Sequence, residues 1–569
     1  MTNKPFPKLV FGWVPSRVAI VASIALFPMT GAFGQVVLPP QSDISRQRVE
    51  PLPLPSNAYD FRIQTPEKSA VPRAVDEVEF SVASIKVTGV THFSADEVDA
   101  IFAPLEGRKI VLQDLRDAAQ KLEDKYRSEG FFLTRVFVAP QKVQDGELQV
   151  QVLEGYINQV FVDGPNPAST RLAEAVVGPI TRKRPTRFSD LERRMLILND
   201  MPGVTGSTVL QQGAVPGSSE MLVTAGRAPN QYRATFANTS SEILGPLSYS
   251  LGGTFFQPLG RPGALDVTLS AAGERLKELR SVNARYAMPL SAHGLIASIG
   301  GLIAFARPGG VVADLDVRSN VLSINTRVRA PLLRGRANSI YIDLGMALNR
   351  NKTTILGELV SDDRSTVAEA TLSWQQANWL SGDTNVSLSL FQGLSLFGAN
   401  DASAEFASVQ GFKPKFQRLV YSLQRTQRLT QRFSVQLNAQ GQYTTDRLAS
   451  GETISFGGSS IGRGYDPSLI GGERGLGVSG ELRYALPYAL PALIEGVQLY
   501  TFADSASATT LAYETDPIVT NKISSIGLGV RLVLIGKVNL DLQGAQARRT
   551  VANDERNEKR FNLNALVAF

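Results

Sequence analysis

The chain has 569 residues, 43% of them hydrophobic and 19% charged, which is too long for one ordinary domain and normal for a folded protein. It has no cysteine and only two histidines, so disulfide scaffolds, thiol catalysis and cysteine zinc sites are excluded, and a Ser-His-Asp triad is disfavoured. The 58 basic residues are nearly balanced by 52 acidic ones, so the net charge of +6 indicates no nucleic-acid groove. We expect no enzyme, no cofactor, no metal site and no nucleic-acid partner.

Residues 1–34 have the pattern of an export signal. Three basic residues occur without an acidic one, an apolar run follows from Val18 to Phe27, and a small-residue end precedes Gln35. A membrane anchor helix is the alternative, but Pro28 and the short apolar run favour cleavage. Export of a cysteine-free chain indicates a bacterial envelope compartment.

Residues 35–78 are rich in proline and charge and lack a sustained period, so we expect a linker. A short polar helix around residues 42–49 is all that this composition allows. The linker therefore leaves open whether a plug helix occupies a pore.

Residues 79–155 have the pattern of a compact mixed unit. A strand at 84–90 precedes the capping box Ser94–Glu97, and a second helix carries Leu112 to Tyr126 on one face. Two strands follow, at 132–138 and 147–153, so the predicted order is β-α-α-β-β.

Residues 156–230 repeat this pattern. Val160 and Val162 open a strand, Ser189–Glu192 gives a second capping-box match, and strands are expected at 203–211 and 221–225. The two units indicate two small α+β domains in tandem.

Residues 231–569 have alternating apolar and polar side chains and few helical signals, as in Phe433–Gln440. No further segment has the roughly 20 apolar residues of a spanning helix, so a membrane location requires a closed β-barrel. Alternation also fits a soluble sandwich. Sixteen strand candidates, with long connections after odd strands and short ones after even strands, favour an outer-membrane barrel. The long connections are expected at 307–320, 352–365, 398–415, 445–476, 504–524 and 548–559, and the short ones at 289–293, 381–383, 426–432 and 536–537.

The last ten residues alternate in the same way and end in Phe569. A C-terminal aromatic residue resembles the signal that the outer-membrane assembly machinery reads. We therefore expect that machinery as a partner during biogenesis and outer-membrane lipid as the surroundings.

The longest connection, after strand 11, contains Arg463 between glycines. Glycines let the backbone approach a wall closely, and a guanidinium binds a carboxylate with two hydrogen bonds. If the apolar face of strand 13 meets lipid, Asp504 points into the lumen, where Arg463 can pair with it. The alternative is an exposed glycine-rich loop with a solvated arginine.

With these features the chain resembles the outer-membrane transporters of two-partner secretion, the haemolysin secretion/activation and filamentous-haemagglutinin transporter family of the POTRA-barrel superfamily. Those proteins have a signal peptide, a linker with a plug helix, two periplasmic POTRA domains and a sixteen-stranded barrel. Their sixth extracellular loop folds into the lumen and contacts an aspartate of strand 13. Gly462 stands where that loop motif usually has valine. The latch residues that the resemblance implies are Arg463, Gly464, Tyr465, Phe502 and Asp504.

The first α+β unit carries the POTRA part of the resemblance. The POTRA substrate-binding region that it implies consists of Tyr126, Gly130, Pro140, Gln141, Gly146, Glu154 and Gly155.

The expected fold class is mainly β, a 16-stranded transmembrane antiparallel β-barrel at 231–569 preceded by two small α+β (β-α-α-β-β) POTRA domains at 79–155 and 156–230. The resemblance implies a pore in the bacterial outer membrane whose periplasmic POTRA domains capture an unfolded exoprotein, which is exported through the barrel without ATP. The partner is a haemolysin, an adhesin or a contact-dependent toxin. The alternative function is an assembly factor that inserts other barrels. Lumen arginines such as Arg285, Arg327 and Arg329 are either sliding contacts for cargo or solvated lining.

Overall fold

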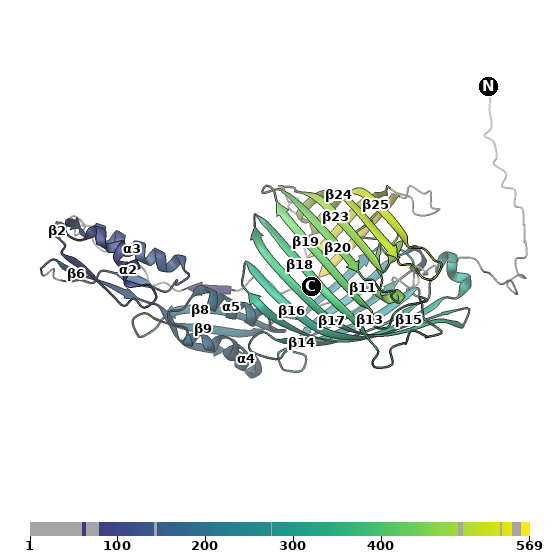
Figure 1. Cartoon of the computed structure of the whole chain (residues 1–569), viewed down its shortest axis with the longest axis horizontal. Coiled ribbons are helices and arrows are strands. Elements are labelled where there is room, and N and C mark those ends of the chain that lie inside the picture. Colours follow the sequence, from purple (N-terminus) through teal and green to yellow (C-terminus); the bar gives the residue numbers. More distant parts are fainter. Residues whose placement is uncertain are drawn as a thin grey trace, which may run out of the picture.

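The computed structural model describes residues 60–63, 79–141, 145–274, 276–487, 493–534, 537–548 and 559–569. Two α+β units and a large barrel follow one another along the length of the molecule (Figure 1). The expected export signal and plug helix lie outside the described residues.

The first α+β unit contains a three-stranded sheet in the order β3-β6-β5, with β3 parallel and β5 antiparallel to β6. Alternate residues of β6 pack against one face of α3. This agrees with the period of two residues in a strand and of three to four residues in a helix. The strand expected at 132–138 is shorter, because only three residues pair with β6. The elements are β2 (Glu79–Ser81), β3 (Ser84–Thr88), α2 (Ala95–Phe102), the 3₁₀ turn η2 (Ala103–Leu105), β4 (Lys109–Val111), α3 (Leu112–Ser128), β5 (Arg135–Phe137) and β6 (Glu147–Leu153).

The two expected capping boxes have different outcomes. Before α2, the amide of Glu97 donates to Ser94 Oγ at 3.3 Å and the amide of Ser94 donates to Glu97 Oε2 at 3.1 Å, as predicted. The box at Ser189 is wrong, because the helix begins earlier, at Phe188. The amide of Phe188 donates to Gly130 O of the first unit at 2.8 Å, so a contact between the units sets the start of this helix.

The second α+β unit has a four-stranded sheet in the order β1-β8-β9-β7. Its outermost strand, β1 (Asp60–Ile63), comes from the linker and runs parallel to β8, an addition that sequence patterning did not predict. The remaining elements are β7 (Tyr156–Asp163), α4 (Pro167–Val177), η3 (Gly178–Arg182), α5 (Phe188–Asp200), β8 (Val204–Gln212) and β9 (Ser218–Arg227).

Sixteen antiparallel strands form a closed barrel, in which β27 pairs with β10, as predicted. The strands are β10 (Gln231–Ala237), β11 (Ser248–Phe256), β12 (Ala264–Ala272), β13 (Leu279–Pro289), β14 (Ile296–Ala306), β15 (Arg318–Arg334), β16 (Asn338–Ile355), β17 (Glu358–Trp379), β18 (Gly382–Leu394), β19 (Gln417–Arg428), β20 (Phe433–Tyr443), β23 (Arg474–Ala485), β24 (Ile494–Thr510), β25 (Val519–Leu534), β26 (Val538–Ala547) and β27 (Lys559–Ala568). The loops add β21 (Ile454–Phe456), β22 (Ile470–Gly472), η4 (Glu242–Leu244), η5 (Gly310–Leu315) and η6 (Ser450–Glu452).

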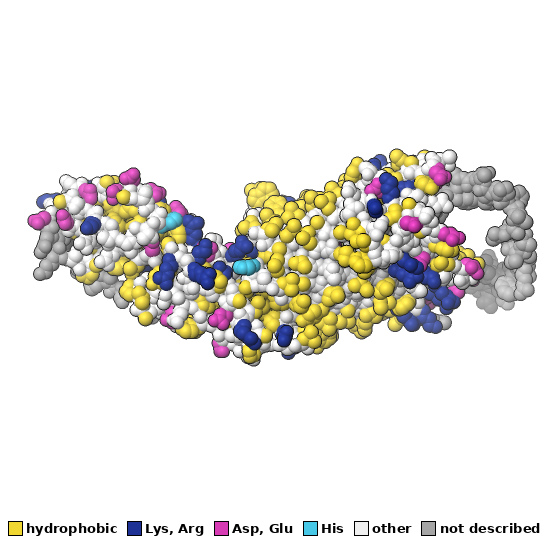
Figure 2. Space-filling model, turned by 60° about the horizontal axis from the view of Figure 1, so that its bottom comes forward, with side chains coloured by type: hydrophobic (Ala, Val, Ile, Leu, Met, Phe, Trp, Pro, Cys, Tyr) yellow, Lys and Arg dark blue, Asp and Glu magenta, His cyan; other side chains and the backbone are white. Residues whose placement is uncertain are grey.

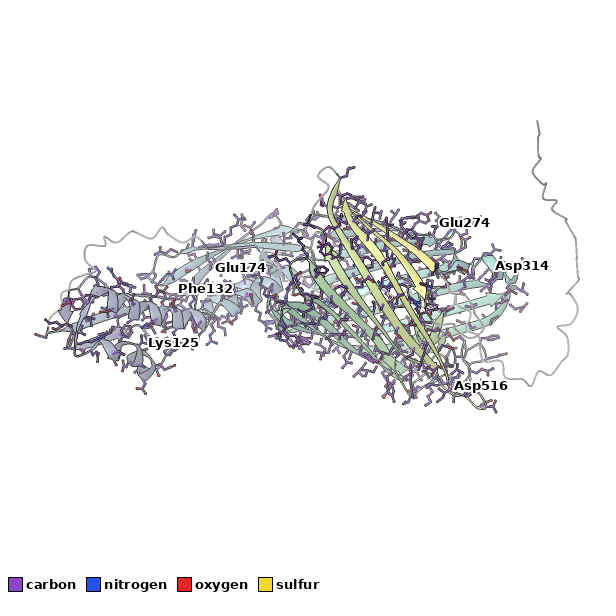
Figure 3. All side chains as sticks on the ribbon, turned by 90° about the horizontal axis from the view of Figure 1, so that it is seen from above. Lys125, Phe132, Glu174, Glu274, Asp314 and Asp516 are labelled. Atoms are coloured by element: carbon purple, nitrogen blue, oxygen red, sulfur yellow. The ribbon has the colours of Figure 1, made fainter. Side chains whose placement is uncertain are left out.

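With β10 counted as the first strand of the barrel, the loops that follow the first, third and later odd strands meet at the rim away from the α+β units. Figure 3 shows Glu274, Asp314 and Asp516 from three of these loops at that end. Two expected loops are wrong. At 352–365 the strands β16 and β17 stay paired almost to their turn, and charged residues face each other across the hairpin, as in the bond from Arg350 Nη2 to Asp362 at 2.8 Å. At 504–524, β24 continues to Thr510 because it remains paired with β25.

The outward face of the barrel is apolar and the inward face is polar. Leucine and isoleucine side chains cover the middle of the barrel, with charged side chains gathered toward its two ends (Figure 2). Serine, arginine and aspartate occupy the alternate, inward positions, such as Ser298, Arg329 and Asp343. In the described part of the chain, no helix is long and apolar enough to cross a membrane.

The second unit is docked on the barrel through its helices and turns. At the end of α5, both carboxylate oxygens of Asp200 accept from Arg334 of β15, at 2.7 and 2.8 Å, and the Arg334 side chain is fully buried. On another turn, Gln257 Nε2 donates to Gly203 O at 2.8 Å and to Ser169 Oγ at 3.0 Å. These contacts fix the position of the second unit at the near rim.

We expect Arg334→Ala to loosen this docking. It leaves Asp200 buried without its cation, which costs about 3–5 kcal/mol. Hydrogen exchange of the amides in α5 should accelerate, whereas Arg336→Ala, in the same turn, serves as the matched control. Adding Asp200→Ala should recover part of the loss, since the unpaired charge is then gone. Unchanged exchange in Arg334→Ala would contradict the docking role.

Candidate functional site

The connection between β20 and β23 packs inside the barrel. Its short hairpin of β21 and β22 brings Phe456, Ile461 and Tyr465 against inward residues of the wall, among them Ile523 and Ala547. All of these side chains are buried. The loop is therefore part of the folded interior of the barrel.

Arg463 lies at the centre of this packed loop and binds two carboxylates. Its Nε and Nη2 donate to the two oxygens of Asp504 at 2.9 and 2.7 Å, and its Nη1 donates to Glu481 Oε1 at 2.7 Å. The guanidinium carbon lies 3.5 Å from the centre of the Phe502 ring, a cation–π contact. Arg463 is only 2% exposed, so these are charge-assisted hydrogen bonds in a nearly dry environment.

The glycines beside Arg463 allow the close approach. Gly462 has φ +87°, a left-handed conformation that a β-branched residue avoids, so glycine in place of the usual valine fits this backbone. A Cβ on Gly464 would lie 2.5 Å from the amide nitrogen of Ala547 in β26. Both positions let the loop backbone lie against the wall.

Two further contacts attach the tip of the loop. Tyr465 Oη donates to Ser524 O of β25 at 2.9 Å. Asp466 accepts from Arg560 Nη1 of β27 at 2.8 Å. The five expected latch residues thus occupy one cluster, and the loop is attached to strands on both sides of β26.

Sequence reasoning missed part of this cluster. Glu481 on β23 binds Arg463 and also Arg531 Nη1 at 3.1 Å, and Arg531 Nε in turn binds Asp541 Oδ2 at 3.0 Å. Ser479 Oγ accepts from Arg463 Nη2 at 2.8 Å. The alternation of β23 places Ser479 and Glu481 on the inward face, and this signal could have identified them.

Two lumen arginines, Arg327 and Arg329, form ion pairs with carboxylates. Arg329 Nε donates to Asp343 Oδ1 at 2.9 Å and Arg327 Nη2 donates to Glu369 Oε2 at 2.7 Å. Arg285 stands opposite Asp266 in the pairing of β12 with β13. Arg327 and Arg329 therefore stand in the lumen as members of ion pairs.

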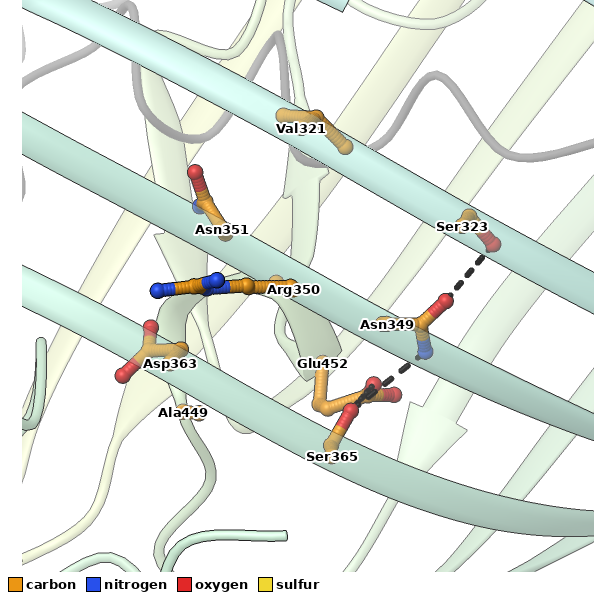
Figure 4. A pocket seen from close by; sticks show the side chains of 10 residues that line it. Val321, Ser323, Asn349, Arg350, Asn351, Asp363, Ser365, Ala449 and Glu452 are labelled. Carbon is orange, nitrogen blue, oxygen red and sulfur yellow. Dashed lines mark hydrogen bonds between the residues drawn. The ribbon is translucent and has the colours of Figure 1, made fainter. Parts of the chain in front are cut away.

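The base of the loop also binds the wall through polar side chains (Figure 4). Ser323, Asn349 and Ser365, on β15, β16 and β17, form a hydrogen-bonded row that ends at Glu452 of the loop. Glu452 Oε2 also lies 2.9 Å from Arg418 Nη2 of β19. The remaining cavity of about 30 Å³ has room for about one water molecule.

In the first α+β unit, Tyr126 and Glu154 are structural. Tyr126 is fully buried and donates to Glu154 Oε1 at 2.6 Å, and the same oxygen accepts from the amides of Thr91 and His92. Burial and this bond raise the pKa of Tyr126. Burial acts to raise the pKa of Glu154, but the donors outweigh it and lower that pKa. A buried Tyr126 cannot contact a cargo directly.

The glycines of the expected POTRA region make turns and the junction between the units. The Gly130 oxygen accepts from Phe188 and the Gly155 oxygen accepts from Thr186, both amides of the second unit. Gly146 has φ +76°, and its oxygen accepts from the amide of Ala83.

Gln141 follows Pro140 beyond the end of β5. Its side-chain amide donates to Gln149 O and accepts from Gln149 N, each at 2.8 Å, so it extends the pairing on β6. Its contacts therefore shape the surface of the unit.

The C-terminal Phe569 lies at the seam where the barrel closes. It exchanges backbone hydrogen bonds with Tyr232 of β10 at 2.8 and 3.0 Å, and the two rings stack with centres 5.7 Å apart. The terminal aromatic residue thus helps to close the seam.

Comparisons with known proteins agree with this architecture. A family model described as "Haemolysin secretion/activation protein ShlB/FhaC/HecB" matches residues 217–532, more than half of the chain, and one for the ShlB-type POTRA domain matches residues 80–155. The outer membrane transporter CdiB of Dickeya dadantii is 24% identical over 82% of this chain and 84% of its own. The heme/hemopexin transporter protein HuxB of Haemophilus influenzae is 19% identical over 79% and 80%.

A solved structure of CdiB from Escherichia coli has a TM-score of 0.68 and 19% identity, covering 88% of this chain and 93% of its own. At this identity the likeness shows the fold. The match of the family model over more than half of the chain shows the family. The chain belongs to the haemolysin secretion/activation protein ShlB/FhaC/HecB family, and it is a non-enzymatic outer-membrane transporter that exports a partner exoprotein.

Proposed function

We propose that the periplasmic α+β units capture the exoprotein as an extended chain and that the Arg463 cluster holds the loop in the conformation that export requires. The buried Arg463–Asp504 pair, which joins the loop to the wall, is the observation that carries the second part. The chain has no nucleotide-binding motif, so binding and folding of the cargo would supply direction. We also propose domain boundaries at 1–34, 35–78, 79–155, 156–230 and 231–569.

The capture step would use β-strand addition, in which main-chain hydrogen bonds to a sheet edge give affinity. Both edges of the sheet in the first unit are partly closed. Glu106 Oε1 accepts from the amide of Ile85 in β3 at 2.7 Å, and Glu123 Oε2 accepts from the amide of Val136 in β5 at 3.1 Å. A side chain that accepts from an edge amide competes with an incoming strand.

In the second unit, β1 of the linker covers the edge of β8. The opposite edge, β7, is covered at its start, where the amide of Ile157 donates to Thr186 Oγ1 at 3.1 Å. Along residues 159–163 the edge carries exposed side chains, including Phe161 at 47% exposure. These observations favour β7 as the edge that receives a cargo strand.

The partner is a secreted exoprotein. Relatives of this chain carry names of two kinds, CdiB transporters and heme/hemopexin transporters. We propose a haemolysin, an adhesin or a contact-dependent toxin as the cargo. Co-expression with an exoprotein encoded beside the transporter, scored for release to the surface or the medium, identifies it.

The capture proposal predicts site-specific crosslinking. Because the chain has no cysteine, Phe161→Cys introduces a unique thiol on β7. With a thiol-reactive crosslinker and a stalled exoprotein, this variant should form an adduct at least about tenfold more than Phe137→Cys, which probes β5 at similar exposure. Equal adducts at both positions would contradict the preference for β7.

The loop proposal predicts that Arg463→Ala impairs secretion while the barrel remains inserted. The change leaves two buried carboxylates without this cation, which costs about 3–5 kcal/mol and should release the loop. Protease cleavage within residues 444–473 should increase, and secretion should fall by about tenfold or more. Arg428→Ala removes an exposed pair with Asp383 and is the control. Normal secretion by Arg463→Ala would eliminate the latch role.

A further inference from the structure

The outer wall of the barrel has a hollow of about 650 Å³ across β16 to β20. Residues of five consecutive strands line it, most of them outward-facing, and it opens to the surroundings of the barrel. The lining residues that the argument uses are Leu344, Ala368, Ala370, Leu390, Leu419 and Tyr443.

The hollow exists because small residues stand between large ones. Ala370 pairs with Leu344 on one side and with Leu390 on the other. Leu390 and Leu344 are 60% and 55% exposed and form walls on either side of the alanine floor. On an apolar face that meets lipid, such a depression offers apolar surface to a hydrocarbon chain.

Polar groups bound the hollow toward the rim with long loops. Gln417 Nε2 donates to Gln392 Oε1 at 2.9 Å, and both residues line the hollow. In an outer-membrane transporter whose α+β units are periplasmic, this rim is the extracellular one. The hollow therefore lies in the outer leaflet.

Two cations lie near this end of the hollow, Lys415 in sequence and Arg474 in space. Lys415, two residues before Gln417, is exposed, and the guanidinium of Arg474 lies 4.9 Å from the ring centre of Tyr443. Within the described residues, neither Lys415 nor Arg474 forms a salt bridge with a carboxylate. Arg474 Nε donates to Thr444 O, so its remaining N–H groups and the Lys415 ammonium are the ones available to an anion.

We propose that this hollow binds a phosphorylated, acylated glycolipid of the outer leaflet, with an acyl chain on the alanine floor and a phosphate beside Lys415 and Arg474. Lipid tails are as apolar as leucine, so the apolar floor alone gives no preference among lipids. The cations give the preference, since they favour a phosphate over a neutral headgroup.

The inward face of the same strands serves a different purpose. Thr371 and Ser389 are hydrogen-bonded there at 2.7 Å, and Glu369 binds Arg327. A cargo in the lumen meets these polar groups and not the outer hollow. The hollow is therefore a site for lipid and independent of the proposed capture edge.

The test measures lipid bound to the full-length protein purified from outer membranes in mild detergent. Retained glycolipid is quantified from its 3-hydroxy fatty acids. Ala370→Phe, which fills the floor, should lower retention by about tenfold. Ala297→Phe is the matched control, because it is an outward alanine of β14 near the opposite rim. Heat-dependent electrophoretic mobility confirms folding of each variant.

Native mass spectrometry with added lipid A, dephosphorylated lipid A and phosphatidylethanolamine distinguishes the contribution of the headgroup to binding from that of the acyl chains. Wild type should prefer the phosphorylated form, and Lys415→Glu should lose that preference without filling the hollow. If Ala370→Phe does not fold, the Lys415→Glu variant still tests whether the hollow binds a phosphorylated lipid. Equal retention by wild type and Ala370→Phe, or equal binding of the three lipids to wild type, would overturn the proposal.

Discussion

The buried guanidinium of Arg463 organises the interior of the barrel. Burying one cation is costly, and here two carboxylates and an aromatic face compensate it. Because its partners belong to β23 and β24 while its backbone belongs to the loop, the loop cannot leave the wall without exposing three charges at once. Gly462 and Gly464 allow this placement, and the contact between Asp466 and Arg560 attaches the same loop to β27.

Much of the barrel was predictable because its strands obey a period of two. Alternation predicted sixteen strands and the inward orientation of Asp504, and the resemblance to the two-partner secretion transporters implied its pairing with Arg463. Loop lengths were less predictable. The hairpin of β16 and β17 extends because Arg350 and Asp362 pair across it, and charged residues in sequence resemble a loop. The first residue of α5 was also not predicted, because a contact with Gly130 in the first α+β unit determines where the helix begins.

Glu481 and β1 show what sequence patterns leave out. Alternation shows that Glu481 faces inward, but it does not identify its partners, because these come from its own strand, from β25 and from the loop. The four residues of β1 have no period of their own, and only the exposed edge of β8 makes them a strand. Tertiary context decides both. The pairing of Arg329 with Asp343 likewise could not be read from the sequence, because it needs the register between β15 and β16.

The linker strand β1 affects which chains can bind at the edge of β8. It is tethered to the sheet that it covers, so it competes for the edge of β8 at an effective concentration that reaches the millimolar range for short tethers. A free chain in the periplasm, present at far lower concentration, is excluded from that edge unless it binds much more tightly or displaces the linker.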